Sequence, residues 1–226
     1  MIGSVLMDNL SMMVMIFNKK LEKKYKFLLQ RNRIKYNVLL YGTGTASSSV
    51  LEYFGLNEIK RDVVLSILPY NLSKYMLKQI DQKLKMDEPG NGIAFTLPIS
   101  SSTKNMKDAY KDYDVEDTYM EESNKHLIIT IASEGYAEEV MNAAKKAGAT
   151  GGTTLNGRGL ETDKIVKFLG ISIEPEKDIV LILADENIKN KIMDSILESC
   201  GLKTLGKGIC FSLPVSHVVG LKNIVD

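Results

Sequence analysis

Residues that build disulfides, metal centres and catalytic sites are scarce in this sequence. It has 2 cysteines and 2 histidines among 226 residues. Cys200 and Cys210 belong to no Cys-x-x-Cys motif and have no histidine cluster beside them, so we expect buried free thiols instead of a disulfide or a metal site. His126 and His217 lack the serine, acid or cysteine partners of a nucleophilic site. We therefore expect no enzymatic activity, no catalytic residues and no metal ligands.

An excess of charge and a long apolar run are also missing. The 29 basic and 28 acidic residues give a formal net charge of +1, so no overall field attracts nucleic acid or an anionic membrane. Any anion site has to be local. The apolar run Leu10–Phe17 is too short to span a bilayer and lacks the flanks of a signal peptide. We expect it to be a buried strand of a cytoplasmic protein without a membrane span.

What the sequence does contain is a repeated segment. Its 44% apolar and 25% charged residues are typical of a soluble globular protein, and its length allows one large domain or two small ones. The segment Gly90–Ser100 has the sequence GNGIAFTLPIS, and Gly206–Ser216 has the nearly identical sequence GKGICFSLPVS. This repetition indicates that the two halves of the chain are related.

The similarity extends over most of both halves. Three further pairs of segments align, namely Tyr41–Leu56 with Asn156–Ile171, Arg61–Leu68 with Lys177–Ala184, and Met12–Phe17 with Leu127–Ala132. A duplication explains this agreement far better than chance does. The predicted organisation is a first repeat at residues 10–101, an acidic linker at residues 102–124, and a second repeat at residues 125–226.

Each repeat has the same predicted order of elements. Its first apolar strand is followed by a helix, at Lys19–Asn32 in one repeat and at Glu134–Gly148 in the other. A second helix is expected to begin with an asparagine cap, at Asn71 and at Asn187. The complete order predicts two tandem ferredoxin-like βαββαβ units of the α+β class, each an antiparallel sheet with helices on one face.

Two kinds of glycine-rich segment are candidates for anion binding. The G-x-G-I motif before the last strand of each repeat permits positive φ and lets consecutive N–H groups face one phosphate oxygen. The alternative is that these glycines only make the tight turn from helix to strand. The segment Gly148–Gly159 carries the hydroxyls of Thr153 and Thr154 and the guanidinium of Arg158, which are donors that suit a nucleotide. The alternative for Arg158 is a solvated loop side chain.

The arrangement of these motifs resembles the PII family of nitrogen-regulatory signalling proteins and its PII-like relatives. The shared features are the βαββαβ order, the G-x-G loop after the second strand, the long segment that follows it, and G-x-G-I-x-F-x-L-P-V on the last strand. The resemblance covers both repeats but not the linker. It implies non-enzymatic trimers that bind ATP or ADP in clefts between neighbours and control a transporter or an enzyme through the mobile loop between strands two and three. The implied effectors are ATP, ADP or AMP, with or without Mg²⁺, and no cofactor is obligatory.

The resemblance also implies which residues bind the nucleotide. In the second repeat they are Thr153 and Thr154 near the adenine, Gly157, Arg158 and Gly159 before the mobile loop Leu160–Lys177, and Gly206, Lys207, Gly208 and Lys222 around the phosphates. In the first repeat, Val38 and Leu39 replace the two threonines, so a second site there would be degenerate. Its residues would be Gly42, Gly44, Gly90, Asn91 and Gly92, with Thr45–Lys60 as the counterpart of the mobile loop.

The sequence departs from the family pattern at three places. Ile93 and Ile209 replace the lysine of the family's phosphate loop, and Lys207 is its nearest substitute. The arginines that follow the family's last strand are missing, and only Gly220 and Lys222 are present instead. No glutamine follows the loop arginine, so binding of 2-oxoglutarate is not implied. We expect anion binding that is weaker than in the family or differently built.

Two other classes of function stay open. One is a tandem ACT-like sensor of an amino acid, which is also built from paired βαββαβ units. The other is a structural trimer like the CutA proteins, although the scarcity of histidine and paired cysteine argues against a metal-carrying role. By analogy with the PII family we expect a homotrimer, in which three chains form two stacked rings or one ring of six units.

Overall fold

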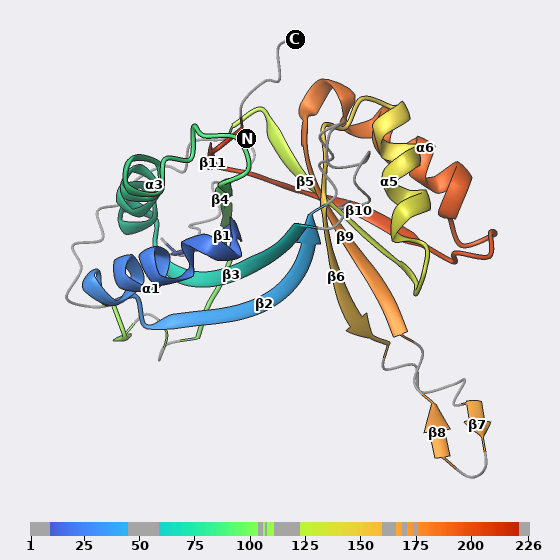
Figure 1. The fold of residues 1–226 in the computed structure, drawn as a ribbon, viewed down its shortest axis with the longest axis horizontal. Coiled ribbons are helices and arrows are strands. Elements are labelled where there is room, and N and C mark those ends of the chain that lie inside the picture. Colours follow the sequence, from blue (N-terminus) through green and yellow to red (C-terminus); the bar gives the residue numbers. More distant parts are fainter. Residues whose placement is uncertain are drawn as a thin grey trace, which may run out of the picture. The chain divides into compact units, whose positions relative to one another are not determined.

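The computed structural model describes residues 10–44, 59–103, 106, 108–110, 123–159, 166–168, 171–173 and 176–221. They belong to two compact units (Figure 1). The first unit consists of Met1–Tyr41, Arg61–Asn124 and Pro214–Asp226, and the second consists of Gly42–Lys60 and Lys125–Leu213. Lys222 and most of the two predicted mobile loops lie outside the described residues.

The first unit is a sheet with two helices packed against it. Its strands follow the order β2-β3-β1-β4-β11, and β1 pairs antiparallel with β3 and β4. The elements are β1 (Leu10–Asn18), a short 3₁₀ helix η1 (Lys19–Leu21), α1 (Glu22–Arg31), β2 (Tyr36–Gly44), β3 (Ile59–Pro69), α3 (Tyr70–Leu84), β4 (Gly92–Pro98) and β11 (His217–Val219). The end of β2, from Gly42 onward, belongs to the second unit.

Both faces of β1 are buried, and alternate residues of the strand form the face that packs against the helices. Met13, Met15 and Phe17 lie on one face because successive strand residues point to opposite sides, and all three are fully buried. They share a core cluster with Tyr25 of α1 and Ile80 of α3. The rings of Phe17 and Tyr25 stack with centroids 5.2 Å apart. α1 and α3 therefore cover the face that these residues of β1 define (Figure 1).

The second unit repeats this plan. Its strands follow the order β10-β5-β9-β6, and β6 is followed by the Gly42–Gly44 end of β2. The elements are β5 (Lys125–Ser133), α5 (Ala137–Lys146), β6 (Thr153–Arg158), β9 (Glu176–Asp185), α6 (Glu186–Cys200) and β10 (Ile209–Pro214). Within the predicted mobile loop, β7 (Val166–Phe168) and β8 (Ile171–Ile173) form a small antiparallel hairpin. Ile128 and Val180 of the sheet share a core cluster with Val140 of α5 and Ile192 of α6.

Both units have the ferredoxin-like strand order. In the first unit, the second and third strands of the repeat lie beside each other, followed by the first and the fourth, and the second unit has the equivalent order. The predicted α+β class with two βαββαβ units is confirmed. Both cysteines are free thiols, with Cys200 buried and Cys210 half-buried. In the described part of the chain, every helix is too short or too polar to traverse a lipid bilayer.

The predicted asparagine caps are wrong. α3 begins at Tyr70 and α6 begins at Glu186, so Asn71 and Asn187 lie inside the first turn of their helices. In each repeat the third strand runs directly into the helix. The cap position is therefore the last strand residue, Pro69 or Asp185, whose backbone is extended and whose side chain makes no capping hydrogen bond.

The compact units divide the chain differently from the predicted repeats. Tyr110, within the predicted linker, is 1% exposed in the core of the first unit. Its hydroxyl accepts from the Lys35 N–H at 3.0 Å and donates to the Ile67 carbonyl at 2.8 Å. At the other end of the chain, β11 pairs with β4, with His217 opposite Thr96. A part of the predicted linker and the last strand of the second repeat thus complete the first unit.

Candidate functional site

The two threonines that were predicted to lie near an adenine open β6. Thr153 and Thr154 are both buried. β6 lies between β9 and the end of β2, where Gly42 stands opposite Leu155 and Gly44 opposite Thr153. The structure therefore brings together residues that the sequence assigned to two different sites, one in each repeat.

Close packing explains the glycine at position 42. A Cβ atom there would lie 2.8 Å from Leu155 Cδ2 and 2.9 Å from the Thr154 carbonyl oxygen, so no other residue fits without a shift of the strand. Thr43, which begins a hydroxyl-rich segment of the sequence, stands opposite Thr154. The buried Oγ1 of Thr154 has no hydrogen-bond partner among the described residues. A buried hydroxyl without a partner costs about 1–3 kcal/mol, and a ligand that bonds to it would recover part of this cost.

Arg158 ends β6 and points toward solvent. Its side chain is 61% exposed, and Nη2 lies 3.6 Å from Oε1 of Glu176, which stands opposite it on β9. An exposed ion pair at this distance contributes little to stability. An incoming phosphate can compete with Glu176 for this guanidinium.

The Gly206–Gly208 turn lies between α6 and β10. The expected positive φ is found at Lys207, with φ of 46°, and not at the two glycines. Gly208 is required because a Cβ atom would lie 2.5 Å from the carbonyl oxygen of Cys200. The N–H of Lys207 donates to Thr204 at 3.3 Å and that of Gly208 donates to Cys200 at 2.6 Å. Because these two amides donate to carbonyls of the protein, they do not point at an external anion. The exposed Lys207 ammonium is therefore the main group of this turn that can bind one.

The corresponding turn of the first repeat begins with Gly90. This residue has a φ of 86°, and its carbonyl accepts a hydrogen bond from Nη1 of Arg61 at 2.6 Å. Arg61 is 8% exposed, and burial lowers the pKa of its guanidinium. Arg61 belongs to none of the predicted site motifs, and its only signal in the sequence is a basic residue at the start of an apolar strand.

Asn91 and Gly92 complete that turn. The Asn91 side-chain amide donates to the carbonyls of Leu84 and Lys85 at 3.0 and 2.9 Å and so closes the end of α3. Gly92 has a φ of 133°, and a Cβ atom there would lie 2.0 Å from the Ile16 carbonyl oxygen. Positive φ is therefore found as expected in the first repeat, where it serves the packing of the turn.

One end of the second unit's sheet collects several predicted site residues. The Ser133 N–H donates to the Gly206 carbonyl at 2.9 Å, Ser133 stands opposite Lys177, and Lys177 stands opposite Gly157. Lys207, Lys177 and Arg158 thus lie along the same end of the sheet, where Lys177 points to the face opposite to that of Arg158. Lys177 was named before as the end of the mobile loop and the start of an aligned segment. Its place beside Gly157 follows from strand register, which the sequence did not define.

The threonines expected near the adenine and the turn expected around the phosphates lie at opposite corners of this sheet. β10 and β6 are separated by three strand spacings, or about 14 Å, and Thr153 lies about 16 Å along β6 from Arg158. The structure thus brings the Gly206–Gly208 turn to the same sheet end as Gly157 and Arg158. It does not bring the turn to Thr153 and Thr154 within one unit.

Comparisons with known proteins give similarity only among solved structures. No protein-family model matches this sequence, and no curated protein matches it. The chain is similar to the Arabidopsis thaliana PII protein bound to citrate, with 24% identity and a TM-score of 0.34 over 42% of this chain and 79% of that chain. It is also similar to a Bacillus cereus protein related to NIF3, with 17% identity and a TM-score of 0.32 over 46% of this chain and 28% of that chain. This chain therefore matches less than a third of the second protein, and the fold assignment rests on the strand order of each unit.

Proposed function

We propose that this protein is a PII-like regulator without enzymatic activity, which binds an adenine nucleotide through its second unit. The observation that carries the proposal is that the turn bearing Lys207 and the strand end bearing Arg158 lie at one end of that unit's sheet. The segment between β6 and β9 begins and ends at this same place, next to Arg158 and Glu176. Phosphates bound there would contact both ends of the segment and would favour one of its conformations. A partner protein would then recognise that conformation.

A complete site requires a neighbouring copy of the chain in this proposal. The buried hydroxyls of Thr153 and Thr154 lie too far from the Gly206–Gly208 turn for one unit to hold both ends of a nucleotide in a single pocket. In a homotrimer, the base would lie against β6 of one chain and the phosphates against the turn of its neighbour. The regulated partner would be a transporter or an enzyme.

The decisive experiment is isothermal titration of ATP, ADP, AMP and cyclic AMP, with and without Mg²⁺. We would compare the unaltered protein with Arg158→Ala and Lys207→Gly, because glycine keeps the left-handed backbone at position 207 and removes only the charge. Lys203→Ala is the matched control, since Lys203 is also an exposed lysine after α6. We expect saturable binding that both site variants weaken about tenfold and that the control leaves unchanged.

Two results would count against this function. If none of the four nucleotides gives a binding signal at millimolar concentration, the protein is not a nucleotide-binding regulator. Saturable binding of an amino acid would then favour the ACT-like class. A monomeric mass by light scattering would remove the neighbour that the complete site requires.

A further inference from the structure

The helices of the two units differ sharply in charge although the units share one fold. In the first unit, the segment Lys19–Lys35 holds eight basic residues and one acid, and Lys74–Lys85 holds four basic residues and one acid. In the second unit, the corresponding segments Glu134–Gly148 and Glu186–Gly201 each hold two basic residues and three acids. The small net charge of the whole chain therefore hides a concentrated positive surface on the first unit.

This positive surface faces solvent. α1 and α3 bury their apolar sides against the sheet, so their charged residues lie on the outer side, and every lysine and arginine of the two segments is exposed. Lys26 pairs with Glu22 at 2.5 Å and Lys85 with Glu88 at 2.8 Å. The two segments together hold twelve basic and two acidic residues, so their surface carries a net positive charge however the individual side chains pair. We call these two exposed segments, with Phe27 between their lysines, the basic helix face.

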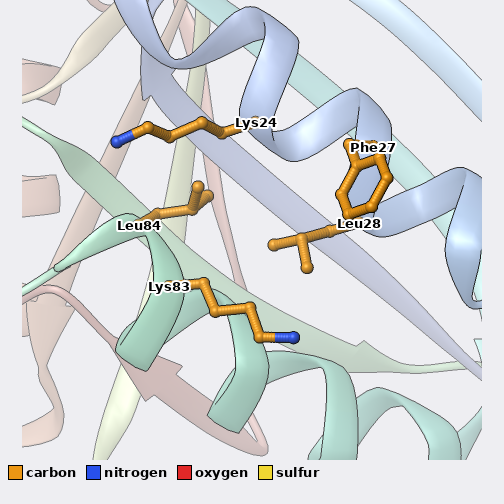
Figure 2. A pocket seen from close by; sticks show the side chains of 5 residues that line it. All are labelled: Lys24, Phe27, Leu28, Lys83 and Leu84. Carbon is orange, nitrogen blue, oxygen red and sulfur yellow. The ribbon is translucent and has the colours of Figure 1, made fainter.

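An exposed aromatic ring interrupts the charges. Phe27 is 59% exposed, although it belongs to an amphipathic helix whose other apolar residues are buried. It lines a hollow of about 140 Å³ between α1 and α3, together with Leu28 and Leu84 and the stems of Lys24 and Lys83 (Figure 2). The hollow therefore has an apolar floor and an ammonium group on each of the two helices that border it.

We propose that the basic helix face binds the surface of an anionic lipid membrane. Ten of the twelve basic residues are lysines, whose compact charges suit the diffuse potential of acidic headgroups, whereas arginine is favoured where a planar anion is recognised in a fixed geometry. The helices are about 15 and 22 Å long, so their charges cover an area rather than a narrow channel. At the headgroup level, an exposed Phe27 would enter the boundary of the acyl chains.

A single-stranded nucleic acid is the competing anionic partner. Sites for it usually combine a basic channel with aromatic side chains that stack on successive bases. The hollow offers one ring with aliphatic neighbours instead, and Tyr75, the other exposed ring of the two segments, does not line it, which favours lipid. The proposal does not depend on nucleotide binding, because the basic helix face belongs to the first unit and the proposed nucleotide site belongs to the second.

The test is co-sedimentation of the full chain with vesicles. One set of vesicles contains phosphatidylcholine with roughly 30% phosphatidylserine, a fraction of anionic lipid that attracts polybasic surfaces. The other set contains phosphatidylcholine alone. The charge variant is Lys24→Glu with Lys83→Glu. The matched control is Lys146→Glu with Lys191→Glu, which alters the net charge equally at exposed positions on the helices of the second unit. Phe27→Ala tests the apolar contact, and circular dichroism establishes that each variant is folded.

We expect binding to the anionic vesicles only, with loss of binding at high salt. The charge variant should weaken binding by at least about tenfold, because it replaces two attractive charges with two repulsive ones, and the control should bind nearly as well as the unaltered protein. Phe27→Ala should weaken binding about threefold to fivefold without altering its salt dependence.

Three results would overturn the proposal. They are equal binding to neutral vesicles, equal weakening by the control pair, and no vesicle binding at all. Tight binding of a single-stranded oligonucleotide that only the charge variant abolishes, together with no vesicle binding, would assign the basic helix face to nucleic acid instead.

Discussion

The Oδ2 atom of Asp178 accepts a hydrogen bond from the N–H of Ala137 at 3.0 Å. The same oxygen accepts the N–H of Gly135 at 2.9 Å, so the third strand of the second repeat holds the start of α5. At the equivalent position of the first repeat, Asp62 accepts from the Tyr25 hydroxyl at 2.8 Å. In both units a buried aspartate ties the third strand to the first helix, although its donors differ.

Removal of the Asp178 carboxylate should destabilise the second unit. Asp178→Ala leaves two amides at the start of α5 without their acceptor, so the free energy of unfolding should fall by about 2 kcal/mol. Urea denaturation measures this difference. Asp194→Ala, at an exposed position of α6, is the control and should have little effect. An unchanged midpoint for Asp178→Ala would show that water replaces the carboxylate without cost.

Stability should depend on pH above 10 through Tyr25. Burial and the hydrogen bond to Asp62 raise the pKa of the Tyr25 hydroxyl above its usual value near 10. The unfolded chain then loses this proton at lower pH than the folded chain. The contribution of Tyr25 to the free energy of unfolding is therefore fully present below pH 10 and decreases as the pH rises further.

Tyr25→Phe tests this dependence. At neutral pH it should lower the free energy of unfolding by about 1–3 kcal/mol, because the buried Asp62 loses its donor. It should also reduce the loss of stability between pH 10 and 11 in urea denaturation. Tyr75→Phe is the matched control, since Tyr75 is 50% exposed. The same alkaline slope in Tyr25→Phe and the unaltered protein would contradict the prediction.

Gly208→Ala should destabilise the protein whether or not a nucleotide binds. The added Cβ would lie 2.5 Å from the Cys200 carbonyl oxygen and would displace backbone, at a cost of about 2–4 kcal/mol. Gly90→Ala has free space around the Cβ but an unfavourable φ, so it should cost only about 1 kcal/mol. Thermal denaturation ranks the two variants. Equal melting temperatures would mean that the turn at Gly208 relaxes easily.

The two thiols should differ in reactivity. Burial raises the pKa of Cys200 to about 11, so very little thiolate forms at pH 8, and the side chain is also inaccessible. The half-buried Cys210 should react first with iodoacetamide, although burial raises the pKa of its thiol as well. Mass spectrometry of the alkylated peptides distinguishes the sites. Cys200 should be modified only after unfolding, and its rapid modification in the native protein would contradict this assignment.

Local sequence patterns were enough to identify most of the elements. The apolar run Leu10–Phe17 predicts a buried strand, and the structure has it as β1, in which Val14 and Ile16 are buried as well as Met13, Met15 and Phe17. The repeated Gly90–Ser100 and Gly206–Ser216 segments located the fourth strand of each βαββαβ repeat. The helix starts were displaced because propensity favours asparagine as a cap, whereas here the strand leads into the helix without a turn.

The sequence by itself determined the duplication and the order of elements, because these depend on neighbours along the chain. Only the tertiary structure decided that Gly42 lies against Leu155 and that His217 stands opposite Thr96. Periodicity fixes which face of a strand is buried but not which distant strand pairs with its edge. The basic helix face arose in the same way. Its lysines are visible in the sequence, but only the packing of α1 and α3 on one sheet gathers them on a single surface.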